Sequence, residues 1–346
     1  MDIAIRPLDL ASDADIAQLC ALDEALDRAR WGGTEPATIA QRRAALESSP
    51  YWTQRCHVAV AEMMEGGQSI VGLASTMLPL RENLETVHVH AEVHPAFRGR
   101  GIGTALVQEA LIPAIRESGR PLVSTWGEIP AEGDADDPAL PANALARRLG
   151  LERRTLGVAR VLDLPVDHAS LDGLEAEAAS RLGAYRVLTW EDAVPEEHLA
   201  AYGALLRQLE LDDPDEDMEH EAPEFTPERI RLIEERRERA GVRCLTAVAL
   251  APDGTFAGNT EIHVRAGEGV TVGWQENTLV MPEHRGHRLG LAMKVANHRR
   301  LAAAAPGLRR LVTWNSHVNP WMIGINEKLG YRIAQREIGF QGRPEL

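Results

Sequence analysis

The chain repeats itself once along its 346 residues, and each copy is about as long as a domain. The clearest matching pair is HPAFRGRGIG at 94–103 and MPEHRGHRLG at 281–290, in which Arg98 corresponds to Arg285. Other pairs follow in the same order, among them LVSTW at 122–126 with RLVTW at 310–314, and ARRLGL at 146–151 with NEKLGY at 326–331. An ordered repeat of this length indicates two copies of one structural unit.

Both halves have the same order of predicted elements. A strand precedes one or two helices, and an antiparallel meander follows, with a fourth strand that ends at Val93 or Val280. A Gly/Arg turn then opens a long amphipathic helix, expected over 101–118 and 288–304, and a fifth strand, a short helix and a last strand close the unit. The predicted fold class is α/β of the α+β type: two tandem units, each a mixed, mostly antiparallel sheet flanked by helices.

The boundary between the two units is expected where the repeat ends. We predict a first domain at 1–165, a linker at 166–183 and a second domain at 184–346. Alanine, leucine and glutamate dominate the linker, and these residues favour a connecting helix over 167–182.

Composition excludes several classes of function. The formal net charge of −15 argues against a nucleic-acid partner or an anionic membrane surface, because both require a basic footprint. The N-terminus has no basic-then-apolar signal pattern, and no apolar run approaches the roughly 20 residues that span a bilayer. Cys20, Cys56 and Cys244 are scattered, which suits buried thiols in a reducing compartment. We therefore expect a cytoplasmic protein.

The strongest chemical signal is the motif V-x-P-x-x-R-G-x-G-x-G between a strand and a helix, at 93–103. A helix N-terminus offers unpaired N–H groups and the positive end of a dipole, which suit a pyrophosphate. Glycines let the backbone approach the phosphates closely, and Arg98 can set the loop or meet a phosphate oxygen. Arg288 replaces Gly101 in the second copy, and there it either helps to bind phosphates or fills the site.

This motif resembles the acyl-CoA motif of the GNAT superfamily of N-acyltransferases, and the resemblance covers nearly the whole chain, once per half. The two-domain arrangement is similar to that of mycothiol synthase. The resemblance implies acetyl-CoA as cosubstrate and no metal. The residues expected to contact the cosubstrate are Val93, Arg98, Gly99, Arg100, Gly101, Ile102, Gly103 and Thr104 in the first half, and Val280, Arg285, Gly286, His287, Arg288, Leu289, Gly290, Leu291 and Asn319 in the second.

The second family signature is better kept in the second half than in the first. In the family, an Asn after the fifth strand contacts the pantetheine, and a Tyr in the following helix reprotonates the CoA thiolate. The second half keeps Asn319 but has Asn326 at the Tyr position, and the first half lacks both. These residues favour the second half for catalysis, with the first half as a CoA-holding or structural partner.

An amine acceptor must lose a proton before it attacks a thioester, and a buried carboxylate can remove that proton. Strand alternation is expected to place Glu276, Thr278 and Val280 on one face, which makes Glu276 the candidate base, with a surface carboxylate or ion-pair partner as the alternative. Asn326 can donate a hydrogen bond to the thiolate but cannot transfer a proton to it. Water or His317 could therefore serve as the acid that protonates the thiolate.

Two further polar patterns have structural alternatives. His88, His90 and Glu92 share a strand face and can bind a metal, but a half-exposed polar face explains them equally well. The acidic stretch at 211–223 can attract a cationic amine, or it is simply a solvated loop.

We therefore expect an N-acetyltransferase acting on a primary amine of a small, cationic molecule, as a monomer or homodimer. The alternatives are a non-catalytic acyl-CoA sensor or assembly protein, and an N-acetyltransferase of proteins or peptides. The residues leave the acceptor and the length of the acyl chain open.

Overall fold

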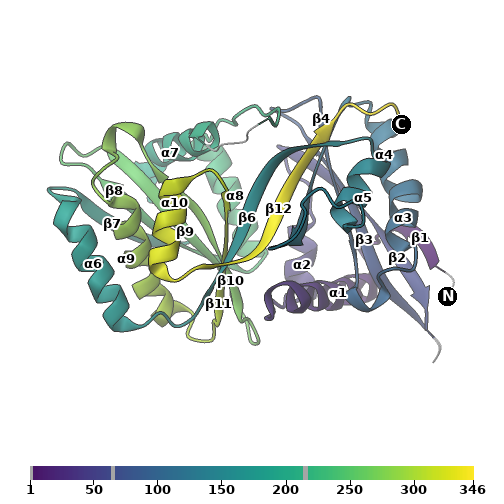
Figure 1. Cartoon of the computed structure of the whole chain (residues 1–346), viewed down its shortest axis with the longest axis horizontal. Coiled ribbons are helices and arrows are strands. Elements are labelled where there is room, and N and C mark those ends of the chain that lie inside the picture. Colours follow the sequence, from purple (N-terminus) through teal and green to yellow (C-terminus); the bar gives the residue numbers. More distant parts are fainter. Residues whose placement is uncertain (1–2, 64–66, 213–216) are drawn as a thin grey trace.

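The computed structural model of the chain describes residues 3–63, 67–212 and 217–346. Within these residues, twelve strands form one continuous sheet in the order β1-β2-β3-β4-β5-β12-β6-β11-β10-β9-β8-β7. Helices cover both faces of this sheet, and the two halves lie side by side along it (Figure 1). The predicted fold class, mixed and mostly antiparallel sheets flanked by helices, is confirmed.

The first half contains these elements: β1 (Ile3–Pro7), α1 (Asp13–Trp31), α2 (Ile39–Ala45), β2 (Trp52–Glu62), β3 (Gln68–Pro79), β4 (Thr86–Val93), η1 (Pro95–Phe97), α3 (Ile102–Leu106), η2 (Val107–Leu111), α4 (Ile112–Ser118), β5 (Leu122–Pro130), α5 (Pro141–Arg148) and β6 (Glu152–Asp163). The helix expected over 101–118 is confirmed, with the π-helical segment η2 inside it. It ends where Gly119 adopts a left-handed conformation.

The second half contains these elements: α6 (His168–Leu182), β7 (Arg186–Glu191), η3 (Glu196–His198), α7 (Leu199–Asp212), α8 (Pro227–Arg239), β8 (Val242–Leu250), β9 (Phe256–Arg265), β10 (Val272–Val280), η4 (Pro282–His284), α9 (Leu289–Ala304), β11 (Arg310–Ser316), α10 (Pro320–Leu329) and β12 (Arg332–Gly342). The expected helices at 167–182 and 288–304 correspond to α6 and α9. The division of the chain into domains at 165 and 184 stays a prediction.

The last strands of the two halves are exchanged, an arrangement that the sequence repeat does not predict. β12, from the end of the second half, pairs with β5 of the first half, whereas β6, from the first half, pairs with β11 of the second. β6 and β12 also pair with each other along the middle of the sheet. Each half is therefore completed by a strand from the other half.

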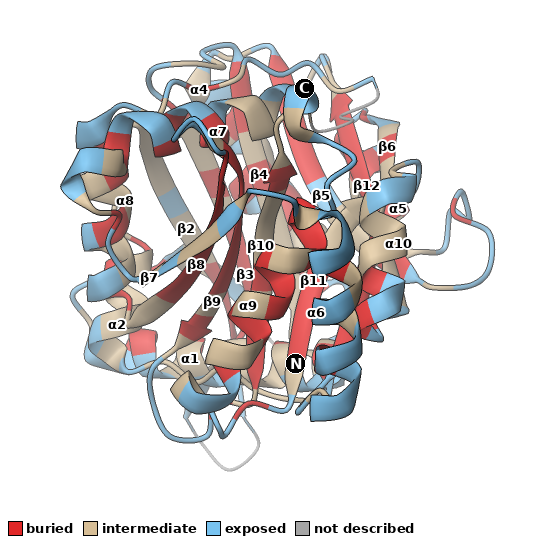
Figure 2. Cartoon of the chain, turned by 90° about the vertical axis from the view of Figure 1, so that its left-hand side faces the viewer, coloured by how far each residue is buried: buried red, intermediate tan, exposed pale blue. Residues whose placement is uncertain are grey.

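Side-chain alternation along the strands gives the sheet two apolar faces. Val58 and Val60 on β2 pack into a core with α1, while Ala59 and Ala61 on the same strand pack into a core with α3. In the second half, Val248 packs with α7, and its neighbour Ala249 packs with α9. Figure 2 shows buried residues along the strands and exposed residues on the outer sides of the helices. Helices α1, α2, α7 and α8 therefore share one face of the sheet.

The two halves also meet through helices on that shared face. The Arg236 guanidinium on α8 donates a hydrogen bond of 2.6 Å to the carbonyl of Ala45 at the end of α2. Arg239 forms an ion pair with Glu47 close by. Among the described residues, no helix is both long enough and apolar enough to cross a membrane.

Candidate functional site

Each half opens where two parallel strands diverge. β4 pairs with β5 only from Thr86 to His88, and β10 pairs with β11 only from Val272 to Trp274. Beyond these pairs, β4 runs on to Val93 and β10 runs on to Val280 with one edge unpaired. Such an edge offers backbone groups to an extended ligand, in the manner of an added strand.

The motif arginine has the same structural role in both halves. Nε of Arg98 donates to the carbonyl of Val93 at 3.2 Å, and Nε of Arg285 donates to the carbonyl of Val280 at 3.2 Å. Each arginine therefore ties its loop to the end of the preceding strand. Arg285 has a second partner, Asp212, whose carboxylate lies 2.6 Å from its guanidinium.

The first loop is open. Gly99 and Gly101 have φ angles of +73° and +81°, which favour glycine, and nothing lies within 4 Å of a Cβ placed at either position. Gly101 precedes α3 without a side-chain cap, so the first amides of the helix face the loop. Ile102 is buried in the core, and Arg98 and Arg100 stand at the surface of the loop. This arrangement suits a phosphate group.

The second loop is engaged by its own chain. Arg288 adopts a left-handed conformation with φ +56°, and its guanidinium donates to the carbonyl of Glu177 at 2.7 Å and to Oγ of Ser180 at 2.9 Å, both on α6. Nδ1 of His287 lies 3.3 Å from the carbonyl of Arg181. These contacts commit the Arg288 guanidinium to α6, and both of its proposed roles at the loop stay predictions.

A second difference lies two residues further along, at the start of the helix. A Cβ on Gly290 would lie 3.1 Å from Cδ1 of Ile325 on α10, whereas the nearest atom to a Cβ on Gly103 is Cγ2 of Val93 at 3.8 Å. Helix α10 therefore closes on the start of α9, and the first half has no equivalent contact.

The remaining residues predicted to contact the cosubstrate lie in both halves. Gly286 is left-handed at φ +90°, and Leu289 and Leu291 are buried in the core. The side chain of Asn319 caps α10, because its Oδ1 accepts the amide of Met322 at 3.1 Å. In the first half, Thr104 is half-buried beside the open loop.

Glu276 lies in a polar cluster on the face covered by α7 and α8. Its carboxylate is 3.9 Å from Nδ1 of His263, and its side chain keeps 37% exposure. Burial raises the pKa of Glu276, and the charge of His263 opposes that shift. The raised pKa suits a carboxylate that accepts a proton.

The expected alternation around Glu276 is wrong. A β-bulge interrupts β10 between Gln275 and Thr278. Thr278 and Val280 consequently face Gly290 on α9, on the opposite side of the sheet from Glu276. A bulge adds one residue to a strand, so side chains beyond it change face.

The neighbours of Glu276 were not predicted from the sequence. Glu261 accepts from Tyr202 and lies 2.8 Å from Nε2 of His263 and 3.3 Å from the Arg237 guanidinium. Burial alone would raise the pKa of Glu261, but the contacts with His263 and Arg237 hold it at about 2. The alternating Glu261 and His263 on β9 are the signal that could have found this cluster.

Cys244, Glu261 and His263 place their ligating atoms within 4.8 Å of one another. However, the Arg237 guanidinium already contacts Glu261 and lies 3.0 Å from Nε2 of His263. A cation at this position would meet that positive charge, so the group carries no metal assignment.

Asn326 is fully buried, and both ends of its amide have partners inside the chain. Its Oδ1 accepts from Nζ of Lys294 at 2.8 Å, and its Nδ2 lies 3.3 Å from Oδ1 of Asn315. Lys294 is also fully buried, which lowers its pKa to about 7. The proposed hydrogen bond from Asn326 to a thiolate stays a prediction.

The opening of the first half has its own charged cluster. Arg30, near the end of α1, bridges the diverging strands: it binds Glu92 on β4, and its Nε lies 3.0 Å from Glu128 on β5. His90 lies 3.1 Å from the same carboxylate of Glu92. Burial would raise the pKa of Glu92, but His90 and Arg30 outweigh it and hold the pKa at about 2. Glu337 on β12 stands directly opposite Glu128.

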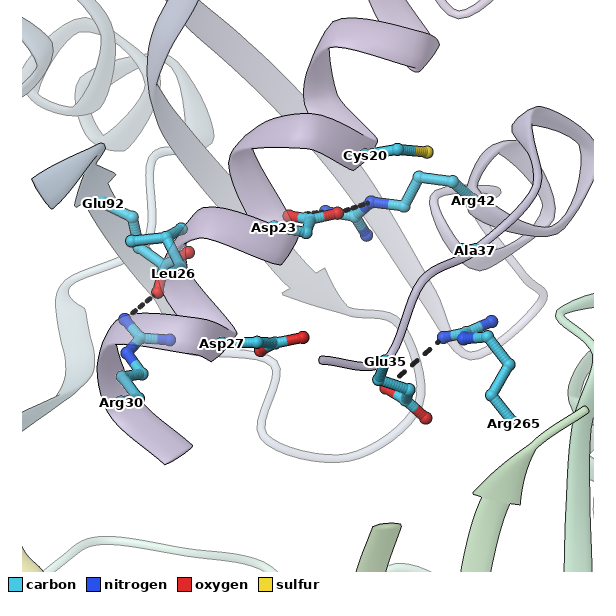
Figure 3. Close-up of a pocket in the computed structure, with 10 residues that line it drawn as sticks. All are labelled: Cys20, Asp23, Leu26, Asp27, Arg30, Glu35, Ala37, Arg42, Glu92 and Arg265. Carbon is cyan, nitrogen blue, oxygen red and sulfur yellow. Dashed lines mark hydrogen bonds and ion pairs between the residues drawn. The ribbon is translucent and has the colours of Figure 1, made fainter. Parts of the chain in front are cut away.

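A cavity of about 210 Å³ lies beside this cluster, between α1, the segment after it and the second half. The residues that line it are Cys20, Asp23, Leu26, Asp27, Arg30, Glu35, Ala37, Arg42, Glu92 and Arg265 (Figure 3).

Four carboxylates face this cavity. Asp23 is paired with Arg42, Glu35 with Arg265, and Glu92 with Arg30. Asp27 points into the space between these pairs, and burial and the nearby carboxylates raise its pKa to about 7. The acidic stretch that the sequence predicts to attract a cationic amine is a different one, 211–223, of which residues 213–216 lie outside the described part of the chain.

Comparisons with known proteins agree with this architecture. Residues 24–128 match the model of the acetyltransferase (GNAT) family. No curated protein sequence matches the chain. A solved tandem GNAT protein from the clavulanic acid biosynthesis pathway, without AcCoA, is 26% identical with a TM-score of 0.77, and the match covers 99% of this chain and 98% of that one.

Two more distant structures share the fold alone. A GCN5-related N-acetyltransferase from Sphaerobacter thermophilus is 18% identical with a TM-score of 0.60, and the match covers 99% of this chain and 97% of that one. The N-myristoyltransferase of Saccharomyces cerevisiae with bound myristoyl-CoA is 10% identical with a TM-score of 0.58, and the match covers 99% and 82%. The first half therefore carries a GNAT-family domain, and the whole chain shares the tandem architecture of a solved GNAT protein, which together support an acyl-CoA N-acyltransferase.

Proposed function

We propose that this protein transfers an acetyl group from acetyl-CoA to a primary amine of a small, cationic molecule, and that the first half holds the acetyl-CoA. The difference between the two loops carries the proposal. Both helices begin without a side-chain cap, but the first loop has a glycine at 101, whereas the second has Arg288, whose guanidinium is bonded to α6. A pyrophosphate therefore meets less of the chain's own side chains at the first helix N-terminus than at the second.

The cavity beside α1 supports a cationic acceptor. Its carboxylates outnumber its guanidinium groups, and Asp27 has no guanidinium partner among the described residues. An ammonium group entering this space would find a negative charge close to Glu92 and the opening of the first half. The acceptor must then lose a proton, so that its nitrogen can attack the thioester carbon.

The second candidate places the reaction in the second half, as the sequence favours. Glu276 supports this reading, because its pKa is raised and its carboxylate is partly exposed beside His263. In that case the first half binds acetyl-CoA without using it in the reaction. Helix α6 and Ile325 would then have to move before the second loop could bind another acyl-CoA.

The experiment places an arginine at position 101, the residue type that the second loop has at position 288. CoA release from acetyl-CoA is measured against a panel of mono- and polyamines for wild type, Gly101→Arg and Glu276→Gln. Loss of turnover in Gly101→Arg, with turnover kept in Glu276→Gln, is the expected result. Loss in Glu276→Gln with retention in Gly101→Arg would move catalysis to the second half.

Two outcomes correspond to the other functions. Acetyl-CoA binding without turnover on any amine would favour a sensor or assembly protein. Turnover restricted to peptides with free N-termini or lysines would identify a protein or peptide N-acetyltransferase.

A further inference from the structure

The strand exchange brings two carboxylates from different halves into register. Glu128 on β5 lies directly opposite Glu337 on β12. Side chains at opposite positions of antiparallel strands have Cβ atoms about 4.5–5.5 Å apart, and like charges there are destabilising. Ile338 and Phe340 belong to the core beneath α3 and α5, so Glu337 faces the other side of the sheet, where α1 lies.

The positive charge around this pair is already committed. Arg30 from α1 bonds to Glu128 and to Glu92, and His90 from β4 also bonds to Glu92. On the other side of Glu337, β6 presents Gly157, which carries no charge. Within the described residues, the Glu337 carboxylate has no ion pair and no side-chain hydrogen bond. Three carboxylates thus share one guanidinium and one imidazole.

A pair of close carboxylates with too little positive charge holds one proton in common. Burial, and then the charge of Glu128, raise the pKa of Glu337 to about 7. Burial also raises the pKa of Glu128, although Arg30 opposes that shift. Glu92, by contrast, is a weak base, because its pKa is held at about 2. The Glu128 side chain keeps 27% exposure, so the pair is accessible from the opening.

We propose that Glu128 and Glu337 act together as the proton acceptor for the amine in the first half, as a base assembled from both halves of the chain. The inference rests on the proposed function. The ionised pair takes one proton from the ammonium of the acceptor, directly or through one water. The free nitrogen then attacks the thioester carbon, a C–N bond forms, and the C–S bond breaks. The departing thiolate takes the second proton of the nitrogen, and the pair returns its own proton to bulk water.

The test is a pH profile of kcat and kcat/KM for acetyl transfer, from about pH 5.5 to 9, with wild type, Glu337→Gln, Glu128→Gln and the double variant. Wild type loses activity on the acid side as the pair takes up its proton. Each single variant is expected to lower kcat on the order of 100-fold. The acid limb should move to lower pH by about one unit in Glu337→Gln, because the neighbouring like charge is gone. The double variant should be no worse than the worse single variant, since the two residues act as one base.

Glu109→Gln, an exposed glutamate on η2, is the matched control and should leave the profile unchanged. If Gly101→Arg abolishes turnover but Glu337→Gln keeps the wild-type kcat and the wild-type acid limb, the inference is overturned and the proposed function stands. Full activity in Gly101→Arg would instead remove the proposed function. If Glu337→Gln fails to fold, Glu337→Asp replaces it: the acid limb is expected to remain with a reduced kcat, and an unchanged kcat would also overturn the inference.

Discussion

At the scale of single residues, the two halves differ by what fills equivalent positions. Gly101 leaves the first loop open, while Arg288 at the matching position ties the second loop to α6. The family motif allowed either reading of Arg288, because a long cation serves a phosphate or a nearby carbonyl equally well. The structure adds that Arg288 bonds to α6, which the sequence predicts as a helix without its packing partner.

Lys294 yields a prediction about stability. Burial lowers its pKa to about 7 in the folded state, so the unfolded chain binds more protons between pH 7 and the ordinary lysine value. The free energy of unfolding should therefore rise with pH across this range, by about 2 kcal/mol between pH 7 and 9 from this residue.

In Lys294→Met this contribution is absent, and denaturant unfolding at the two pH values measures it. Lys328→Met, an exposed lysine on α10, serves as the control. If the free energy of unfolding depends on pH equally in wild type and in Lys294→Met, the lowered pKa of the buried Lys294 amine is contradicted.

At the scale of elements, local sequence patterns predicted the helices over 101–118, 167–182 and 288–304. Thr226 and Pro227 begin α8, and Gly330 ends α10, as their types require. The bulge in β10 was missed, because no glycine or proline marks it and Glu276 and Asn277 continue a plausible alternation. Glu276 therefore stays a predicted base, and the sequence did not predict the face on which it lies or its neighbours on β9 and α7.

Helix α6 is expected to depend on Arg288. This residue contacts Glu177 and Ser180 on α6, and Lys328 also pairs with Glu177. Arg288→Gly should increase amide hydrogen exchange across 168–182, because the helix loses these contacts, while exchange across 102–118 stays unchanged. Arg299→Gln, which removes exposed ion pairs to the same helix, is the matched control and should have a smaller effect. Equal protection of α6 in wild type and Arg288→Gly would show that Arg288 does not hold it.

At the scale of the whole molecule, the exchange of β6 and β12 makes the halves interdependent. The sequence did not reveal it, because the last strands of both halves follow the same pattern and either can pair with β5 or β11. Pairing is decided by which edges meet in space, a long-range property that strand periodicity does not encode.

The exchange predicts a single unfolding transition. Strands β5 and β11 each depend on a strand from the other half, so neither half keeps its sheet when the other unfolds. Calorimetry should give one peak, with the calorimetric enthalpy equal to the van't Hoff enthalpy. Removal of 332–346 should destabilise the first half as well as the second. Two separate peaks in the full chain would contradict this interdependence.

The central claim, that the first half holds the acetyl-CoA, is tested most directly by calorimetric titration of acetyl-CoA into wild type, Gly101→Arg and Arg288→Gly. The account predicts one site per chain in wild type, no binding in Gly101→Arg, and an unchanged first site in Arg288→Gly. Binding that survives Gly101→Arg with unchanged affinity would place the acetyl-CoA elsewhere and contradict the account.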